Sequence, residues 1–178
     1  MSTIAPRITV ARAPAPPPLP SLGEILATRP LRVVFDTNVL LSMFVFADSR
    51  FAPLRAEVDT GHWLAYTRTD CLDEFRRVLD YSMFKLEPER QLAAFEAYAA
   101  IAQQAEDALA ADTAVLPKCK DKDDQKFLEL ARDIAADWLV SSDKALLKLN
   151  RKMLGRYRIL KPEQAMKELL EQTATGIR

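Results

Sequence analysis

Two short apolar runs, each followed by an aspartate, stand out in the pattern of hydrophobic and polar positions. The first covers residues 31–35, ends in three consecutive apolar residues and is followed by Asp36. The second covers residues 138–140 and continues through two serines to Asp143. Uninterrupted apolar runs of this length are typical of central parallel strands that are buried on both faces. Both runs are therefore predicted to be strands that deliver an aspartate at their carboxyl end.

The rest of the pattern predicts an alternation of helices and strands. Helices are expected from near Val39 and over 53–60, 70–79, 87–110, 124–136 and 162–172; further strands are expected over 62–67, 115–117 and 158–160. Strands that alternate with helices form a parallel sheet with helices packed on both faces. The predicted fold class is α/β, a three-layer α/β/α sandwich with a central, mainly parallel sheet.

Length and composition indicate one domain with a tail. The chain has 178 residues, of which 49% are hydrophobic and 28% charged, enough for one well-packed core. Residues 1–30 hold most of the eleven prolines, many of them in Ala-Pro repeats. Such composition favours a flexible, partly polyproline segment. We therefore divide the chain into a Pro/Ala-rich extension over 1–30 and a domain over 31–178.

Cysteine, histidine and hydropathy exclude several classes of protein. The two cysteines, Cys71 and Cys119, are far apart, and His62 is the single histidine, so neither a disulfide framework nor a zinc site is indicated. His62 is expected to fill a core or surface position. No apolar run approaches the roughly 18 residues of a membrane span. We expect no membrane association and a cytoplasmic location.

Four acidic residues are candidates for chemistry. Asp36 and Asp143 follow the two apolar strands, where ligands bind in open α/β sheets. Glu74 lies beside the apolar stripe of the helix expected over 70–79. Asp124 lies on the core-facing stripe of the helix expected over 124–136. Three of them also have a simpler interpretation: Asp36 as a turn residue, Glu74 as a surface residue, and Asp124 as an acid favoured by the helix dipole.

Together the four acids indicate a metal centre. Carboxylates that converge on one pocket repel one another and have raised pKa values unless divalent cations neutralise them. Ligation by oxygen alone suits Mg²⁺ or Mn²⁺. One or two such ions can orient a water for in-line attack on a phosphodiester.

Charge is balanced overall but not locally. Lys+Arg and Asp+Glu number 25 each, so any binding to nucleic acid requires a local patch. Residues 144–161 contain seven basic residues and no acid, directly after Asp143. The RNA-binding candidates in this run are Lys144, Lys148, Arg151 and Lys152. Tyr157 is a candidate to stack on a base. A run of this kind can equally be a solvated face.

Four segments together resemble the PIN domain family. They are VVFDTNVLLS, TDCLDEFRRVL, CKDKDDQKFLELA and DWLVSSDKALL, in this order and at these separations. The similarity covers about residues 31–166 and is greatest to the toxin components of toxin–antitoxin modules. The resemblance implies that Asp36, Glu74, Asp124 and Asp143 are the metal-binding and catalytic set. It also assigns supporting roles to Asn38, Ser141 and Asp121.

The resemblance implies an activity and its partners as well. The expected function is a Mg²⁺- or Mn²⁺-dependent ribonuclease that hydrolyses single-stranded RNA, is often a homodimer and is held inactive by a cognate antitoxin protein. A haloacid-dehalogenase-type phosphatase would need an aspartate at position 38, where this chain has Asn38. A non-catalytic PIN domain that binds RNA or a protein partner is the remaining alternative.

Overall fold

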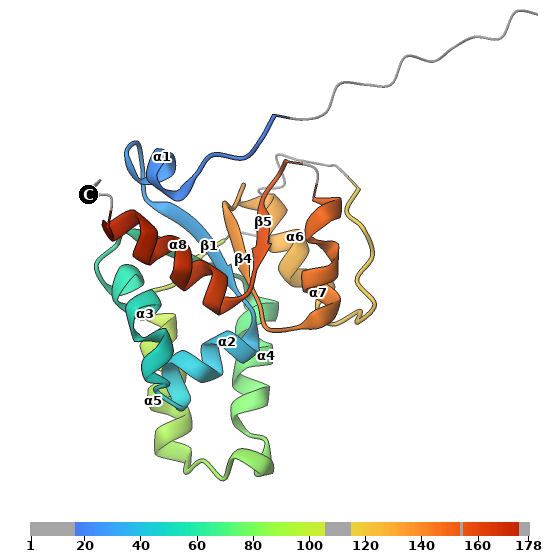
Figure 1. Cartoon of the computed structure of the whole chain (residues 1–178). Helices are drawn as coiled ribbons and strands as arrows, with labels where there is room; N and C mark the ends of the chain where they lie inside the picture. The colour runs from blue at the N-terminus through green and yellow to red at the C-terminus, as the bar shows by residue number, and fades with distance from the viewer. Residues whose placement is uncertain (1–16, 106–114, 154, 175–178) are drawn as a thin grey trace, which may run out of the picture.

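A five-stranded, all-parallel sheet forms the centre of the molecule (Figure 1). The computed structural model describes residues 17–105, 115–153 and 155–174. The strand order is β3-β2-β1-β4-β5. The strands are β1 (Leu31–Phe35), β2 (Trp63–Thr67), β3 (Gln103–Gln104), β4 (Trp138–Val140) and β5 (Arg158–Leu160).

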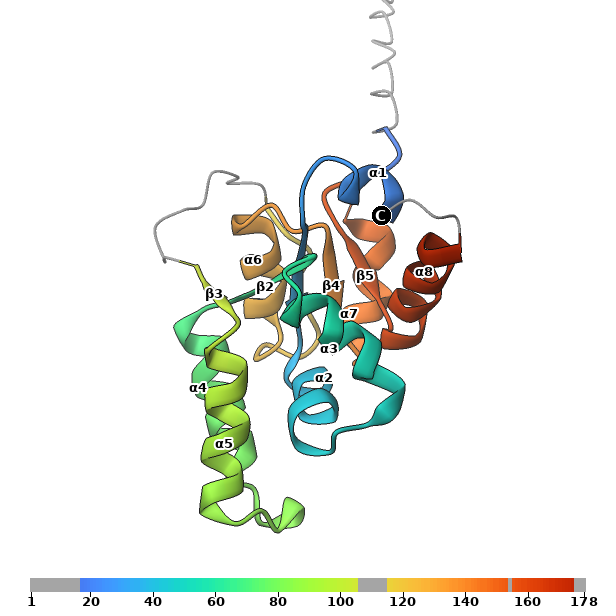
Figure 2. The same cartoon turned by 90° about the vertical axis from the view of Figure 1, so that its left-hand side faces the viewer.

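Helices cover both faces of this sheet (Figures 1 and 2). They are α1 (Leu22–Leu26), α2 (Thr37–Leu40), α3 (Ala52–Asp59), α4 (Thr69–Leu79), α5 (Pro88–Ala99), α6 (Gln125–Asp133), α7 (Lys144–Leu149) and α8 (Pro162–Ala174). A π-helical turn, Leu41–Val45, continues α2, and a 3₁₀ turn, Asn150–Lys152, continues α7. None of the helices in the described part of the chain is long and apolar enough to span a bilayer.

The alternation of side chains along the strands divides the interior into two cores. Val33 and Phe35 of β1 pack with α1, α3 and α8, whereas Val34 between them packs with α6 and α7. In β4, Leu139 faces the second core and its two neighbours face the first. Burial on both faces explains why these strands are apolar without interruption. The predicted three-layer α/β/α sandwich is confirmed.

The two aspartate-bearing strands are neighbours. Phe35 of β1 pairs with Val140 of β4 in parallel register, so both strands end at the same level. The backbone N–H of Asp36 donates to the Val140 carbonyl over 3.0 Å. The chain leaves β1 towards β2 on one side and returns to β4 on the other. The carboxyl ends of β1 and β4 therefore form the switch point where ligands bind in such sheets.

Two elements between residues 87 and 117 differ from the prediction. The helix expected over 87–110 ends at Ala99, and Gln103–Gln104 instead extends the sheet beside β2. Leu92, whose spacing predicts a core position, is 56% exposed. Residues 115–117 form no strand, and Val115 is 93% exposed. Apolar spacing cannot show where a helix stops when alanines fill most positions, and residues 106–110 lie outside the described part of the chain.

The segment assigned to the N-terminal extension contains a packed helix. Leu22 and Ile25 of α1 are buried in the core beside α8, and Leu22 is only 3% exposed. A Cβ atom at Gly23 would lie 2.6 Å from Oε1 of Gln172, so α1 and α8 approach closely. Ser21 caps α1 with a capping box to Glu24. Residues 21–30 therefore pack with the domain, and its start lies before residue 31.

Truncation of Leu22 tests whether α1 belongs to the core. We expect Leu22→Ala to lower the free energy of unfolding by about 2–4 kcal/mol, because a buried leucine is replaced by a cavity. Leu92→Ala is the matched control and should cost less than about 1 kcal/mol, because Leu92 is exposed. Urea titration followed by circular dichroism measures both values; equal losses would contradict the packing of α1.

Candidate metal and nuclease centre

Asp36 is a buried carboxylate at the carboxyl end of β1. It is 3% exposed, and its Oδ1 accepts the backbone N–H of Val39 over 2.9 Å. Its Oδ2 accepts the hydroxyl of Ser141 and the backbone N–H of Ser142, the latter over 3.2 Å. Burial raises the pKa of Asp36 to about 6, the charge of Asp143 adds to this, and the three hydrogen bonds oppose it. Asp36 is thus both the cap of α2 and an inward-facing acid.

Ser141 joins Asp36 to Asp143. Its hydroxyl donates to Asp36 and accepts the backbone N–H of Asp143 over 2.9 Å. The Oδ1 atom of Asp143 caps α7 by accepting the N–H groups of Ala145 and Leu146 over 2.6 and 3.1 Å. A carboxylate is favoured at a helix N-terminus. One buried hydroxyl therefore sets the relative position of two acids that lie 107 positions apart in the sequence.

Glu74 approaches the same place from α4. Its Oε1 accepts the hydroxyl of Thr37 over 2.6 Å, and its Oε2 pairs with the ammonium of Lys126. Thr37 follows Asp36 directly, so this hydrogen bond brings the middle of α4 to the end of β1. Arg68 occupies the N-terminal cap position of α4, without a capping side chain among the described contacts. The inward orientation predicted for Glu74 is observed.

The pKa of Asp124 reflects its burial and the charges of the other acids. It occupies the cap position of α6 and is half-buried, yet the described backbone of α6 donates no capping hydrogen bond to its side chain. Burial is the largest cause that raises the pKa of Asp124 to about 7. The further causes, in decreasing order, are the charges of Asp143, Asp121, Asp36 and Glu74. The four predicted acids therefore share one electrostatic environment.

The chemistry of these donors suits a hard divalent cation. All four side chains offer carboxylate oxygens, and a cation would relieve the repulsion that raises the pKa of Asp124. Within residues 17–105, 115–153 and 155–174, no three Asp, Glu, His or Cys side chains stand close enough to form a ready metal cluster. The four carboxylates are the type of ligand that Mg²⁺ and Mn²⁺ prefer. In this structure the carboxylate of Glu74 pairs with Lys126.

A comparison with models of protein families identifies the family of this chain. A family model described as PIN domain matches residues 32–145, which is more than half of the chain. The chain belongs to the PIN domain family. The match begins in β1, ends in the first turn of α7 and contains Asp36, Glu74, Asp124 and Asp143. PIN domains are generally nucleases that use divalent metals. No curated protein and no solved structure matches the chain.

The predicted supporting residues lie at different distances from the centre of this PIN domain. Ser141 is fully buried between Asp36 and Asp143. Asn38 is exposed, and its carbonyl oxygen accepts the hydroxyl of Ser42 over 3.0 Å. Asp121 is exposed, and its carboxylate accepts the N–H of Asp123 over 3.0 Å. Asp121 contributes charge to the centre, whereas the described contacts of Asn38 do not reach the four acids.

An open hollow lies beside Asp143. It has a volume of about 550 Å³ and is lined by Asp143 and Ala145 of the α7 start and by residues 120–123 of the loop before α6. Lysines and aspartates alternate in that loop. Of the four acids, Asp143 lines this hollow, next to the start of α7.

Two contact residues of the PIN centre escaped the sequence interpretation. Thr37 orients Glu74, and Lys126 pairs with it. Thr37 stands between Asp36 and Asn38 and has no pattern of its own. The position of Lys126 was informative, because the helix dipole disfavours a cation in the first turn of a helix. A lysine at such a position indicates that an acid lies nearby.

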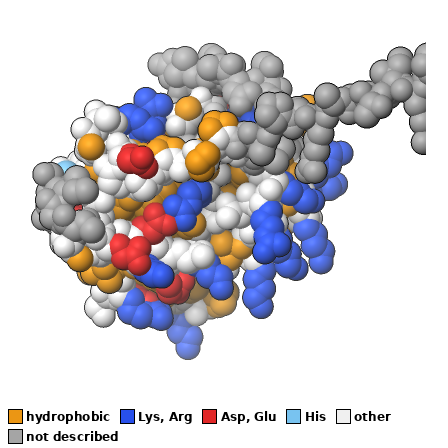
Figure 3. Space-filling model, turned by 45° about the horizontal axis from the view of Figure 1, so that its top comes forward, with side chains coloured by type: hydrophobic (Ala, Val, Ile, Leu, Met, Phe, Trp, Pro, Cys, Tyr) orange, Lys and Arg blue, Asp and Glu red, His pale blue; other side chains and the backbone are white. Residues whose placement is uncertain are grey.

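The basic run is divided between surface and core. Lys144, Lys148, Arg151 and Lys152 are all exposed along α7 and the 3₁₀ turn that follows it. Lys and Arg side chains gather on the right-hand side of Figure 3, where α7 and the segment before α6 lie. Tyr157 is not available to stack on a base: it is 2% exposed, and its hydroxyl donates to the Leu128 carbonyl over 3.0 Å.

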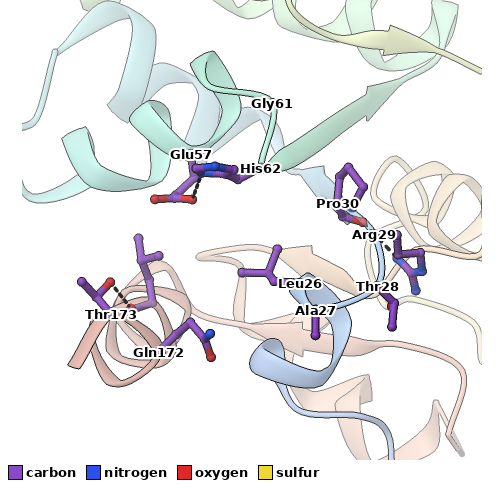
Figure 4. Close-up of a pocket in the computed structure, with 11 residues that line it drawn as sticks. Leu26, Ala27, Thr28, Arg29, Pro30, Glu57, Gly61, His62, Gln172 and Thr173 are labelled. Atoms are coloured by element: carbon purple, nitrogen blue, oxygen red, sulfur yellow. Dashed lines mark hydrogen bonds and ion pairs between the residues drawn. The ribbon is translucent and has the colours of Figure 1, made fainter. Parts of the chain in front are cut away.

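A second hollow lies at the opposite, amino-terminal edge of the sheet (Figure 4). Its volume is about 560 Å³, and α1, the end of α3 and α8 line it. His62 points into this region with its ring against Glu57, 3.0 Å from Nδ1 to Oε2, and it is exposed. His62 is thus a surface residue, as the sequence suggested, and none of the four acids lines this hollow.

The raised pKa of Asp124 makes stability depend on pH in a defined direction. The folded state binds the proton of this carboxyl more tightly than the unfolded chain does, so the cost of ionisation is fully present above about pH 7 and fades as the pH falls towards the ordinary pKa of 3.8. Asp124→Asn should therefore raise the melting temperature of metal-free protein at about pH 8, and this gain should shrink towards about pH 5.

The matched control for this measurement is Asp73→Asn, which removes an exposed carboxylate from α4. Thermal unfolding in EDTA across the pH range compares the two variants with the unaltered chain. A gain that is the same at every pH, or equal in both variants, would contradict the electrostatic environment described for Asp124.

Proposed function

We propose that this PIN domain is a metal-dependent endoribonuclease that hydrolyses phosphodiester bonds of single-stranded RNA. The observation that carries the proposal is the placement of four carboxylates around the switch point of the sheet, where burial first and then the charges of neighbouring acids raise the pKa of Asp124. A divalent cation bound between these carboxylates would offset their negative charges. Family membership supports a nuclease with divalent metal.

Each acid has a structural role in this proposal. Asp36, Glu74, Asp124 and Asp143 would hold Mg²⁺ or Mn²⁺. The bound ion would supply an activated water and stabilise the leaving oxygen. Ser141 holds Asp36 and Asp143 in register, and Thr37 orients Glu74. The burial of Asp36 keeps its carboxylate poorly solvated and therefore available to a cation.

The exposed basic face beside the centre supports RNA as the substrate. Lys144 directly follows Asp143, and Lys148 lies one turn further on the same face of α7. Arg151 and Lys152 continue this face in the next turn. A flexible single strand can follow such a row of cations and place a phosphodiester in the hollow beside Asp143.

The biological setting is proposed from the resemblance to toxin components. We propose that the enzyme acts in the cytoplasm as the toxin of a toxin–antitoxin module, that a cognate antitoxin protein holds it inactive, and that it forms a homodimer. The hairpin of α4 and α5, which projects beyond the carboxyl end of the sheet in Figure 2, offers surface next to the acidic centre. An antitoxin bound there would lie close to Glu74 on α4.

A second candidate function is a non-catalytic PIN domain that binds RNA or a protein partner. The observation that favours it is the ion pair between Glu74 and Lys126, together with the lack of three convergent ligands in the described ranges 17–105, 115–153 and 155–174. A binding module would retain RNA without cleaving it. Titration with Mn²⁺ separates the two functions, because only the enzyme requires the ion.

Single substitutions of the acids test the proposed activity. Asp36→Asn, Glu74→Gln, Asp124→Asn and Asp143→Asn should each lower metal-dependent cleavage by at least about 100-fold, because each removes a charged ligand. The assay incubates a mixed pool of single-stranded RNA with purified protein in EDTA, Mg²⁺ or Mn²⁺ and follows the products on a gel.

Asp73→Asn serves again as the control, and we expect it to cleave at the rate of the unaltered chain. Circular dichroism verifies that every variant is folded, which matters most for Glu74→Gln because this change leaves Lys126 without its partner. Full activity in Asp36→Asn would refute the site assignment. Metal binding without cleavage of any RNA would favour the binding module.

Removing two cations from α7 and the following turn tests the RNA-binding face. In EDTA, Lys148→Gln/Arg151→Gln should weaken binding to single-stranded RNA, and the slope of log affinity against log salt should become shallower by about 1.4 for two lost phosphate contacts. Lys85→Gln/Lys167→Gln removes the same charge from two exposed positions elsewhere. Equal slopes for both double variants would show that this face is merely solvated. Fluorescence anisotropy at several salt concentrations measures the slopes.

A further inference from the structure

Lys126 occupies an unusual position for a cation. It is the second residue of α6, next but one to Asp124, in the turn where the positive end of the helix dipole disfavours positive charge. Its side chain is only 18% exposed. A lysine that is both partly desolvated and opposed by the dipole requires a compensating partner.

The partner is Glu74 of the acidic centre. The Thr37 hydroxyl donates to Oε1 of Glu74, whereas Oε2 forms an ion pair with the Lys126 ammonium and accepts no hydrogen bond among the described residues. The side chain of Glu74 is 12% exposed. The pair therefore lies largely out of water, where the attraction between opposite charges is stronger than at an exposed surface.

We infer that Lys126 is a built-in counter-ion of the acidic centre that a divalent cation displaces from Glu74. This inference rests on the metal-dependent centre of the proposed function. In the metal-free protein, the ammonium offsets one of the four negative charges and keeps Glu74 out of ligating geometry. Binding of the ion at Glu74 requires Lys126 to release the carboxylate, and the flexible four-carbon stem permits this. Lys126 thereby sets the concentration of divalent cation at which the centre fills.

The geometry supports displacement over a permanent ion pair. A structural pair would satisfy the carboxylate of Glu74, yet its buried Oε2 accepts no hydrogen bond among the described residues. The ammonium of Lys126 therefore offsets the charge of Glu74 without saturating this oxygen, which stays available to a divalent ion.

Direct measurement of Mn²⁺ binding without RNA tests this inference. Isothermal titration of the full chain should show Mn²⁺ binding about three- to tenfold tighter in Lys126→Gln than in the unaltered chain, because the competing cation is gone. Lys126→Arg retains the charge and should bind within about twofold of the unaltered affinity. Lys118→Gln, which removes an exposed lysine ahead of the same helix, is the matched control and should leave affinity unchanged.

The metal-free proteins provide a second readout. In EDTA, Lys126→Gln should melt at a lower temperature than Lys118→Gln, because four carboxylates then lack their counter-ion, and saturating Mn²⁺ should abolish this difference. Unchanged or weaker Mn²⁺ binding in Lys126→Gln overturns the inference, as does the absence of Mn²⁺ binding in the unaltered chain. A loss of Mn²⁺ affinity of about tenfold in Lys126→Arg also overturns the inference.

The outcomes separate this inference from the proposed activity. If the unaltered chain binds Mn²⁺ and cleaves RNA while Lys126→Gln shows no gain in affinity, the counter-ion role is wrong and the nuclease stands. If Lys126→Gln binds Mn²⁺ more tightly but no variant cleaves RNA, the counter-ion role stands and the nuclease is wrong.

Discussion

Mutual repulsion among four carboxylates is the constraint on which the arrangement of this molecule depends. The ends of β1 and β4 hold Asp36 and Asp143 side by side, and α4 and α6 add Glu74 and Asp124. Folding must offset the cost of assembling these charges without a cation. The N-termini of α2 and α7 donate N–H groups to the first two acids. Lys126 offsets the charge of Glu74, and burial together with the charges of the other acids raises the pKa of Asp124 to about 7.

The sequence predicted the parts of this centre that depend on strands. A buried parallel strand must be apolar on both faces, so β1 and β4 are visible as apolar runs, and their last residues fix where Asp36 and Asp143 lie. The inward orientation of Glu74 followed from helical periodicity. Thr37 and Lys126 could not be predicted from periodicity, because their partners lie 37 and 52 positions away in the sequence and are set by tertiary packing.

Errors in the prediction share a physical origin. Local spacing shows which residues are apolar, but it does not show what covers them. Leu92 has core spacing and is exposed, while Tyr157, predicted to face RNA, is buried over α6 with its hydroxyl bonded to Leu128. Leu22 lies among prolines, yet α8 covers it. In each case the deciding contact comes from an element that is remote in sequence or from the absence of one in the described chain.

The four acids differ in how firmly the fold holds them, and this difference has a functional consequence. Asp36 and Asp143 are fixed by strand register and by one buried hydroxyl, Ser141, so their separation cannot change without disturbing the sheet. Glu74 lies on α4 and is held by side-chain contacts with Thr37 and Lys126, whereas the side chain of Asp124 at the start of α6 makes no capping hydrogen bond with the described backbone. Under the proposed function, a centre built in this way would have a rigid half that positions the ion and an adjustable half that regulates its affinity. Control of a PIN nuclease through α4 or α6 would therefore act on metal affinity first.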